Sequence, residues 1–236
     1  ALGDLNGDNF KDIVVAGGPT LGTKIFWYKF AGRDVPITKH LISDVGGGDR
    51  VVVAAINNDA CLDVVAVGEF GVSWFENPRC TAGGDVTQPW PQRVIDGAMG
   101  AHDLIVADLN NDKLMDVIVR PETSGPIRIY LQPASGTQWT KVELPMGAIA
   151  GGLGLAVADL DVDGQPDIIA NGIWFANPGV AAVATAAAWT SHQFTNPADW
   201  PKASIAVGDL NNDGRPDVLL SRSPINLSGD ALPGPL

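Results

Sequence analysis

Five nine-residue stretches carry oxygen-bearing side chains at alternate positions, and they are the parts of this sequence best suited to chemistry. They read DLNGDNFKD from Asp4, AINNDACLD from Ala55, DLNNDKLMD from Asp108, DLDVDGQPD from Asp159 and DLNNDGRPD from Asp209. Calcium binds roughly six to eight oxygen ligands, mostly from carboxylates, amides and carbonyls. Because alternate residues of a tight loop point toward one centre, we predict a calcium-binding loop in each stretch.

The predicted ligands are the side chains at positions 1, 3, 5 and 9 of each loop, together with the backbone carbonyl of position 7. These side chains are Asp4, Asn6, Asp8, Asp12, Asn57, Asp59, Asp63, Asp108, Asn110, Asp112, Asp116, Asp159, Asp161, Asp163, Asp167, Asp209, Asn211, Asp213 and Asp217. The fourth loop has aspartate at all four positions, so we predict that it binds calcium most tightly. The second loop has Ala55 at position 1, and we expect its site to be weak or empty.

Other positions of the loops separate this motif from related ones. Position 6 is where the chain turns sharply, which suits Gly164 and Gly214 and suits Ala60 and Lys113 poorly. Position 12 is apolar in every loop, so the bidentate Glu of an EF-hand is missing. Asp, Asn and Gly also favour ordinary turns. Five copies in register, each with Asp at position 9, nevertheless favour a metal.

The acidity of the chain follows from these loops. The formal net charge is -12 and the isoelectric point is about 4.4. The loops contain 15 of the 27 acidic residues, so five bound calcium ions would leave a net charge of about −2. The charge therefore does not indicate a basic partner, and an acidic surface disfavours nucleic acid and anionic membranes.

The loops recur with their surroundings. Their first residues are 51, 53, 51 and 50 apart. A short Val- and Ile-rich run follows every loop, and a similar run precedes loops 2 to 5. A run with aromatic residues and a run of alternating polar and apolar residues complete the first four repeats. Four short strands per repeat predict an all-β protein, a β-propeller of four-stranded antiparallel blades. We expect one domain over 1–236, with repeats at about 1–46, 47–99, 100–149, 150–202 and 203–236.

The repeats amount to about 4.5–5 blades, because the first and last are incomplete. Either five blades close with an incomplete last one, or the chain is part of a larger ring, and we favour the second interpretation. The chain opens in mid-pattern, so we expect that a leader or upstream segment has been removed. No apolar run is long enough to insert into a membrane. Cys61 and Cys80 leave two alternatives, a disulfide in a secreted protein or two free thiols.

The repeat motif resembles FG-GAP/VCBS-type calcium-binding propeller repeats, which occur in integrin α-chain heads, fungal lectins and secreted bacterial proteins. The segments WFENP from Trp74 and WFANP from Trp174, each followed by a Trp-containing fourth strand, are most similar to a secreted bacterial and fungal subgroup. That subgroup includes aldos-2-ulose dehydratase, a sugar-acting lyase. The resemblance implies calcium sites, a secreted or periplasmic location and a ring of usually seven blades, of which this chain would be a fragment.

A ligand face is expected opposite the calcium hairpins, near the central channel, where segments before strand one and after strand two converge. The candidate catalytic residues there are Glu69, His102, Asp103 and Arg120, with His102 beside Asp103 as a general base. The alternative is a solvated loop with ordinary salt bridges. The recurring tryptophans are expected to pack within or between blades. His40 and His192 are expected on the surface of outer strands.

Three functions remain open from the sequence. The first is a secreted, calcium-stabilised propeller that binds carbohydrate or an extracellular protein. The second is a sugar lyase or dehydratase with its site on the channel face. The third is an adhesion or assembly module that associates with itself through unclosed propeller edges, because an exposed sheet edge invites pairing with another chain.

Overall fold

The computed structural model describes residues 1–17, 23–46, 48–68, 71–97, 100–121, 125–146, 153–200 and 203–222. Within these residues the chain forms four four-stranded antiparallel sheets and one two-stranded sheet. Each sheet corresponds to one predicted repeat, and we call them blades 1 to 5. In blades 1 to 4 the strands lie side by side in the order of the sequence. The predicted β-propeller fold is therefore confirmed.

The strands of the five blades have the following bounds. Blade 1 contains β1 Leu2–Gly3, β2 Asp12–Ala16, β3 Ile25–Lys29 and β4 Thr38–Ser43. Blade 2 contains β5 Arg50–Ala54, β6 Asp63–Gly68, β7 Gly71–Phe75 and β8 Gln92–Asp96. Blade 3 contains β9 Asp103–Ala107, β10 Asp116–Arg120, β11 Ile127–Leu131 and β12 Thr140–Leu144. Blade 4 contains β13 Ala156–Ala158, β14 Asp167–Ala170, β15 Ile173–Ala176 and β16 Thr190–Gln193, and blade 5 contains β17 Ala203–Gly208 and β18 Asp217–Arg222.

Helical structure in the described residues is limited to three short 3₁₀ turns, η1 Pro78–Cys80, η2 Ala186–Ala188 and η3 Pro197–Asp199. Among these residues, no helix has the length and the hydrophobicity that crossing a membrane requires.

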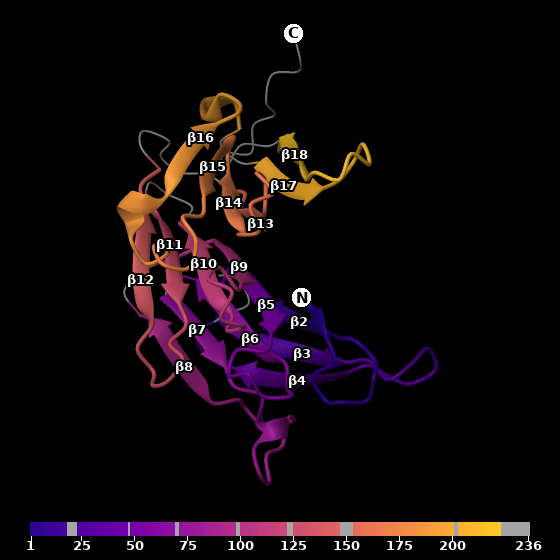
Figure 1. Cartoon of the computed structure of the whole chain (residues 1–236). Coiled ribbons are helices and arrows are strands. Elements are labelled where there is room, and N and C mark those ends of the chain that lie inside the picture. Colours follow the sequence, from indigo (N-terminus) through magenta and orange to yellow (C-terminus); the bar gives the residue numbers. More distant parts are fainter. Residues whose placement is uncertain are drawn as a thin grey trace.

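The blades follow one another along an open arc, in which the first strands are innermost (Figure 1). Strand β5 contacts β9, β9 contacts β13, and β13 contacts β17. The fourth strands form the outer rim, and every residue of β16 is exposed. The ring is not closed by blade 5, which agrees with the interpretation that the blades are part of a larger ring.

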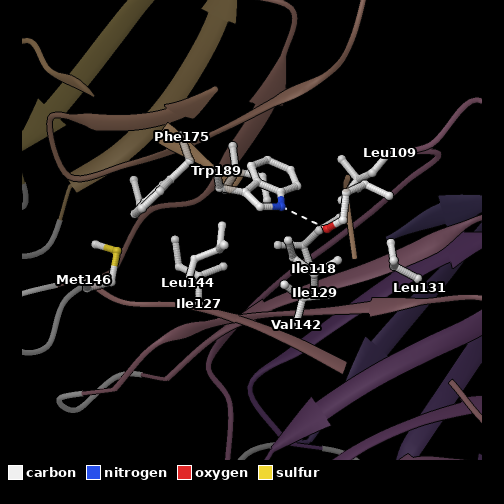
Figure 2. Packing of buried hydrophobic residues seen from close by; sticks show 13 residues of the cluster. Leu109, Ile118, Ile127, Ile129, Leu131, Val142, Leu144, Met146, Phe175 and Trp189 are labelled. Carbon is white, nitrogen blue, oxygen red and sulfur yellow. Dashed lines mark hydrogen bonds between the residues drawn. The ribbon is translucent and has the colours of Figure 1, made fainter. Parts of the chain in front are cut away.

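The second strand of each blade is the centre of the packing. In β6, Val64 and Ala66 pack against blade 1, whereas Val65 and Val67 pack against blade 3. This alternation follows from the two-residue period of a strand, which sends neighbouring side chains to opposite faces. The three buried apolar clusters accordingly lie between blades 1 and 2, 2 and 3, and 3 and 4, and Figure 2 shows the last of them.

The outer face of blade 1 has apolar side chains that no other blade covers in the described part of the chain. Ile13 and Val15 of β2 occupy the positions of Val64 and Ala66 in β6, but they are 39% and 41% exposed. At the other end of the arc, Leu219 of β18 is 55% exposed. Both end blades therefore present apolar side chains that the same repeat buries elsewhere.

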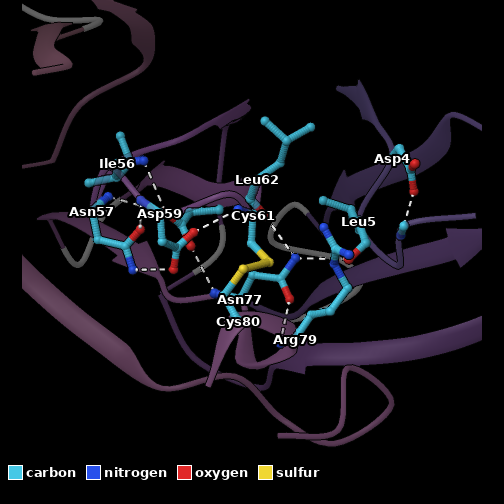
Figure 3. The surroundings of a disulfide bond; sticks show 12 residues. Asp4, Leu5, Ile56, Asn57, Asp59, Cys61, Leu62, Asn77, Arg79 and Cys80 are labelled. Carbon is cyan, nitrogen blue, oxygen red and sulfur yellow. Dashed lines mark hydrogen bonds between the residues drawn. A yellow bond between two sulfur atoms is a disulfide. The ribbon is translucent and has the colours of Figure 1, made fainter. Parts of the chain in front are cut away.

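Side-chain amides connect successive blades beneath the predicted calcium loops. Each lies just after a third strand, and its side-chain nitrogen donates to the main-chain oxygen at position 2 of the preceding blade's loop. The pairs are Asn77 with Leu5 (2.9 Å), Gln132 with Ile56 (2.6 Å) and Asn177 with Leu109 (2.8 Å). Figure 3 shows the first of them. Such bonds fix each blade against the hairpin of its neighbour.

Cys61 and Cys80 form a disulfide within blade 2 (Figure 3). Cys61 is at position 7 of the second loop, and Cys80 ends the η1 turn that follows the third strand. Of the two alternatives left open by the sequence, the structure therefore has the bridge.

Candidate metal loops and inter-blade pockets

The predicted calcium loops are the hairpins between the first and second strands of each blade. In loop 4, the Asp159 carboxylate accepts hydrogen bonds from the backbone N–H groups of Asp163 (3.0 Å) and Gly164 (2.9 Å). The equivalent aspartates of loops 1, 3 and 5 accept the same two bonds, from positions 5 and 6. The carboxylate at position 1 therefore fixes the backbone of the loop through these two hydrogen bonds.

The backbone takes positive φ at two positions of these loops. Position 6 is one of them, as expected, and even Lys113 adopts it with φ of 70°. Position 4 is the other, with φ of 57° at Asn111 and 64° at Val162. The second site of strain was missed from the sequence, although Gly7 and three asparagines at position 4 are residues that tolerate this conformation.

The aspartate at position 9 is buried in loops 1 to 4 and half-buried in loop 5. In loop 3, Asp116 is 0% exposed. Its Oδ2 accepts from Leu109 N (2.9 Å) and its Oδ1 from Gln132 N (2.8 Å). Burial raises the pKa of Asp116 to about 6, and nearby loop aspartates add to this effect against the two hydrogen bonds. Burial also raises the pKa of Asp63 to about 6. A cation bound beside either carboxylate would lower its pKa again.

Loop 4 has the geometry that best fits calcium. Carboxylate oxygens of Asp159, Asp161 and Asp167 lie within 4.8 Å of one another. In loop 3 the position-3 residue is Asn110, whose Nδ2 donates to Asp112 (2.9 Å). Binding a cation there requires the amide oxygen of Asn110 to turn inward instead. That loop 4 binds calcium most tightly stays a prediction.

The second loop departs from the other four. Ala55 offers no carboxylate to positions 5 and 6, and Ala60 is not among the described residues with positive φ. As in the other loops, the carboxylate at position 5, here Asp59, accepts from the N–H of position 7, here Cys61 (2.7 Å). Cys61 is bonded to Cys80, so neither sulfur is a metal ligand here. The hairpin of blade 2 thus lacks the carboxylate at position 1 and has a covalent bond at position 7.

The proposed catalytic residues His102, Asp103 and Arg120 come together at the opposite end of the blades. Asp103 binds Arg50 of blade 2 through Oδ1 (3.1 Å) and Gly154 N of blade 4 through Oδ2 (2.7 Å). The His102 Nδ1 atom lies 3.6 Å from Asp103 Oδ1. Arg120 is 2% exposed. Glu69, the fourth candidate, lies outside the described residues.

Arg120 completes a polar connection between blades 3 and 4. Its Nη1 donates to the Gly154 carbonyl (2.9 Å) and to Asn171 Oδ1 (2.8 Å). Burial lowers the pKa of Arg120 to about 10 despite the charge of Asp103, so Arg120 stays charged at neutral pH. The adjoining pocket has a volume of only about 260 Å³, whereas ligand pockets usually have about 300–1,000 Å³.

Asp103 itself is poorly suited to act as a base. Burial favours its neutral form, but the His102 ring, the Gly154 N–H and the Arg50 charge outweigh burial and lower the pKa of Asp103. A useful base has a pKa near the working pH. Asp103 is therefore a hydrogen-bonded connection across three blades, and the role of His102 as a base stays a prediction.

The recurring tryptophans have two different environments. Trp27 and Trp90 lie between blades 1 and 2, and both indole N–H groups donate to the Val86 carbonyl (3.2 and 3.1 Å). Trp189, between blades 3 and 4, donates to the Val183 carbonyl (2.9 Å; Figure 2). These three are at most 7% exposed. The expectation that they pack between blades is confirmed for them.

Trp74 and Trp139 lie at the corresponding place between blades 2 and 3, but they are only half-buried. They line a pocket of about 780 Å³. The ion pair of Arg93 with Glu76 (2.8 Å) stands at the same pocket. The recurrence of these tryptophans in the sequence does not predict that Trp74 and Trp139 are more exposed, because the equivalent residues are buried at the two neighbouring interfaces.

The two histidines expected on outer strands lie there and stack on tryptophans. His40 stacks on Trp27 and His192 on Trp174, with ring centroids 4.6 and 4.5 Å apart. Arg93 is the register partner of Trp74 in blade 2, the place that these histidines hold in blades 1 and 4.

Comparison with known proteins agrees with the repeat seen in the sequence and the structure. The family model for FG-GAP-like repeats matches residues 4–66, 56–119 and 108–170. The chain belongs to the FG-GAP-like repeat family. Each of these matched segments runs from one predicted calcium loop through the second strand of the next blade, so the family's unit is one blade plus the following hairpin.

Whole-chain comparisons add less. No curated protein sequence matches this FG-GAP chain. One chain in the structure of a mutant form of the Photorhabdus luminescens Tc holotoxin pore is similar, at 15% identity and a TM-score of 0.41. The match covers 93% of this chain and 10% of that chain.

Proposed function

We propose that this FG-GAP chain is a calcium-stabilised propeller module of an extracellular or periplasmic protein, and that it binds carbohydrate or protein. The observation that carries the proposal is the convergence of Asp159, Asp161 and Asp167 within 4.8 Å in loop 4. Three carboxylates at such distances repel one another unless a cation lies between them. Bound calcium would supply this positive charge and hold the hairpin in its folded geometry.

The fold gives calcium a structural role. In loops 1 to 4, the aspartate at position 9 is hydrogen bonded both to its own hairpin and to a residue just after the third strand, as Asp167 is to Leu160 N (2.8 Å) and Asn177 N (2.9 Å). An ion at this carboxylate therefore stabilises the whole blade and not only a surface turn. A ligand that binds only the folded state stabilises the fold by mass action.

The disulfide supports a location outside the cytoplasm. Disulfides persist in oxidising compartments and are rare in the cytosol. The Cys61–Cys80 bond joins the second loop to the η1 turn of the same blade. The disulfide lies in the loop that has Ala55 in place of a carboxylate at position 1, so it holds the hairpin of blade 2 without the full set of calcium ligands.

Calorimetric titration with calcium tests the proposal directly. The chelated protein is titrated with calcium, and the variant Asp161→Ala is compared with Asp34→Ala, which removes an exposed acid outside every loop. We expect the high-affinity part of the isotherm to be lost in Asp161→Ala and retained in Asp34→Ala. Equal titrations of both variants would contradict a site at loop 4.

The sugar lyase or dehydratase alternative rests on the resemblance of WFENP and WFANP and on the proximity of His102 to Asp103. It has weaker support than binding, because Asp103 is held by partners from the blades on either side and the adjoining pocket is small. Retained lyase activity in His102→Gln would exclude His102 as the base.

Assembly is a second candidate, favoured by the exposed Ile13 and Val15 on blade 1. These positions are buried between blades elsewhere, so their natural partner is the face of another blade of the same repeat. Sedimentation equilibrium should then show concentration-dependent association that Val15→Glu abolishes. A monomer at all concentrations would count against assembly by this face.

A further inference from the structure

The three interfaces between the complete blades differ in one respect, the connection between the third and fourth strands of the later blade. In blade 2 this connection spans 76–91 and in blade 4 it spans 177–189. In blade 3 it spans only 132–139. We call the first two the covering loops, because each closes the interface to the preceding blade.

The covering loops make two kinds of contact with the tryptophans beneath them. Val86 and Val183 each present a main-chain carbonyl to an indole N–H, and both side chains pack on the apolar clusters. A covering loop thus supplies an acceptor oxygen and an apolar surface at the same point. Tyr and Trp usually have a partner for their polar group when they are buried.

The short connection of blade 3 offers no such acceptor oxygen to an indole N–H. It turns at Gly136, with φ of 85°, and its residues Pro133 to Thr137 line the pocket. In the part of the chain that the structure describes, we find no hydrogen bond from the indole N–H of Trp74 or Trp139 to another protein group. The pocket of about 780 Å³ is therefore the space that a covering loop fills at the other two interfaces.

We propose that this pocket binds a pyranose oligosaccharide that stacks on Trp74 and Trp139, a proposal that rests on the binding function put forward above. The two contacts that a covering loop makes define the chemistry of the occupant. It must present acceptor oxygens and a flat apolar surface together, and a pyranose ring does so with its hydroxyl groups and its face of C–H bonds.

The other walls of the pocket fit the same chemistry. Asn58 and Gln92 bring amide groups, which both donate and accept hydrogen bonds, as sugar hydroxyls do. Arg93 and Glu76 form an ion pair at the pocket, so their charges offset one another and do not favour a charged ligand. The volume lies within the range of about 300–1,000 Å³ that is usual for small-molecule sites. A neutral sugar of two or three rings is therefore the expected occupant.

The pocket is also a site that the fold keeps rigid. Trp74 lies within β7 and Trp139 directly precedes β12, and both pack against the cluster between blades 2 and 3. Gln132, which follows β11, binds the Ile56 carbonyl (2.6 Å) and so fixes one blade against the other below the pocket. Little ordering is then required on binding, which favours affinity.

Titration of intrinsic tryptophan fluorescence with four neutral trisaccharides, maltotriose, cellotriose, chitotriose and xylotriose, tests this site. We expect at least one of them to change the emission saturably, at millimolar or lower concentration. Trp74→Ala should weaken that binding by about tenfold or more. Trp174→Ala is the matched control, because it changes the same repeat position in blade 4, and its affinity should stay within about twofold of the unmodified chain.

Ser135→Trp provides a second variant that leaves the core untouched, because Ser135 is exposed and lines the pocket. The added ring would fill the space and should abolish binding without lowering thermal stability. Absence of binding by all four sugars, or equal losses in Trp74→Ala and Trp174→Ala, would overturn the proposal.

The same samples separate failure of this site from failure of the broader function. A chain that calcium stabilises but that binds none of the four sugars would overturn the sugar site and leave the calcium-stabilised module standing. A chain that binds a sugar, but whose melting temperature does not respond to calcium, would support the pocket and contradict the structural role of the metal.

Discussion

Replacement of Asn177 by alanine should weaken the contact between blades 3 and 4 to a measurable extent. Asn177 is 4% exposed. Its Nδ2 donates to the Leu109 carbonyl of blade 3 (2.8 Å) and to the Pro166 carbonyl of its own blade (2.9 Å). Its Oδ1 accepts from Gly179 N (3.0 Å). Three hydrogen bonds are thus lost together in a place that water reaches poorly.

The expected magnitude follows from the number of bonds. A buried hydrogen bond contributes about 0.5–1.5 kcal/mol net, and an orphaned partner costs somewhat more. Asn177→Ala should therefore lower the free energy of unfolding by about 2–4 kcal/mol. For a chain of this size, that corresponds to a fall in melting temperature of roughly 5–15 °C.

Urea unfolding followed by both circular dichroism and tryptophan fluorescence measures this change and shows whether the blades unfold together. Asn177→Asp keeps the size and one acceptor but loses both donors, so it should destabilise at least as much. Gln193→Ala removes an exposed amide of the same blade and should change stability by less than about 0.5 kcal/mol. A similarly small effect of Asn177→Ala would refute the view that these amides hold the blades together.

Two further predictions concern the disulfide and the polar connection on the channel side. Replacing both Cys61 and Cys80 by serine should lower the free energy of unfolding by about 2–4 kcal/mol, because the disulfide no longer restricts the unfolded chain by closing a loop between residues 19 apart in the sequence. An unchanged urea midpoint at saturating calcium would contradict this. Asp103 has a pKa in the folded state below its ordinary value of 3.8, so its charge stabilises the fold above about pH 4, and this stabilisation is lost as the pH falls through the folded pKa. Asp103→Asn should accordingly be less stable than the unmodified chain at pH 7, with the gap narrowing below pH 4; a gap that is independent of pH would refute the assignment.

The architecture could be predicted from the sequence because the repeat carries its own signals. Asp at position 9 fixes the hairpin and the two-residue alternation of Val64 to Val67 buries both faces of the second strand. Local patterns of this kind recur with each blade, so they are visible without knowledge of the neighbours. Positive φ at position 4 was missed, although Asn58 and Asn111 there are typical of it.

The environment of the tryptophans could not be predicted in the same way. Trp27 and Trp74 occupy the same position of the repeat, yet one is 1% exposed and the other is half-buried. The difference comes from the connection in the next blade, where Val86 covers Trp27 and the shorter stretch 132–139 leaves Trp74 open. It depends on a contact between segments far apart in the chain, which no local pattern records.

Three of the four candidate residues on the channel side, His102, Asp103 and Arg120, lie together in the structure, but their contacts could not be predicted from the sequence. His102 and Asp103 are neighbours in any conformation, whereas Arg50 and Gly154 reach Asp103 from the blades on either side. These partners make Asp103 an ionised, hydrogen-bonded link between three blades. Only the arrangement of three blades shows this.

Thermal unfolding with saturating calcium and then with excess chelator tests the central claim most directly. Each site that is filled at about a hundred times its Kd adds about 2.7 kcal/mol, so several filled loops should shift the melting temperature by more than about 10 °C. We predict a fall of at least this size on chelation, restored by added calcium but not by magnesium. A melting temperature that is unchanged by chelator would show that the loops are ordinary turns and that calcium does not stabilise the blades.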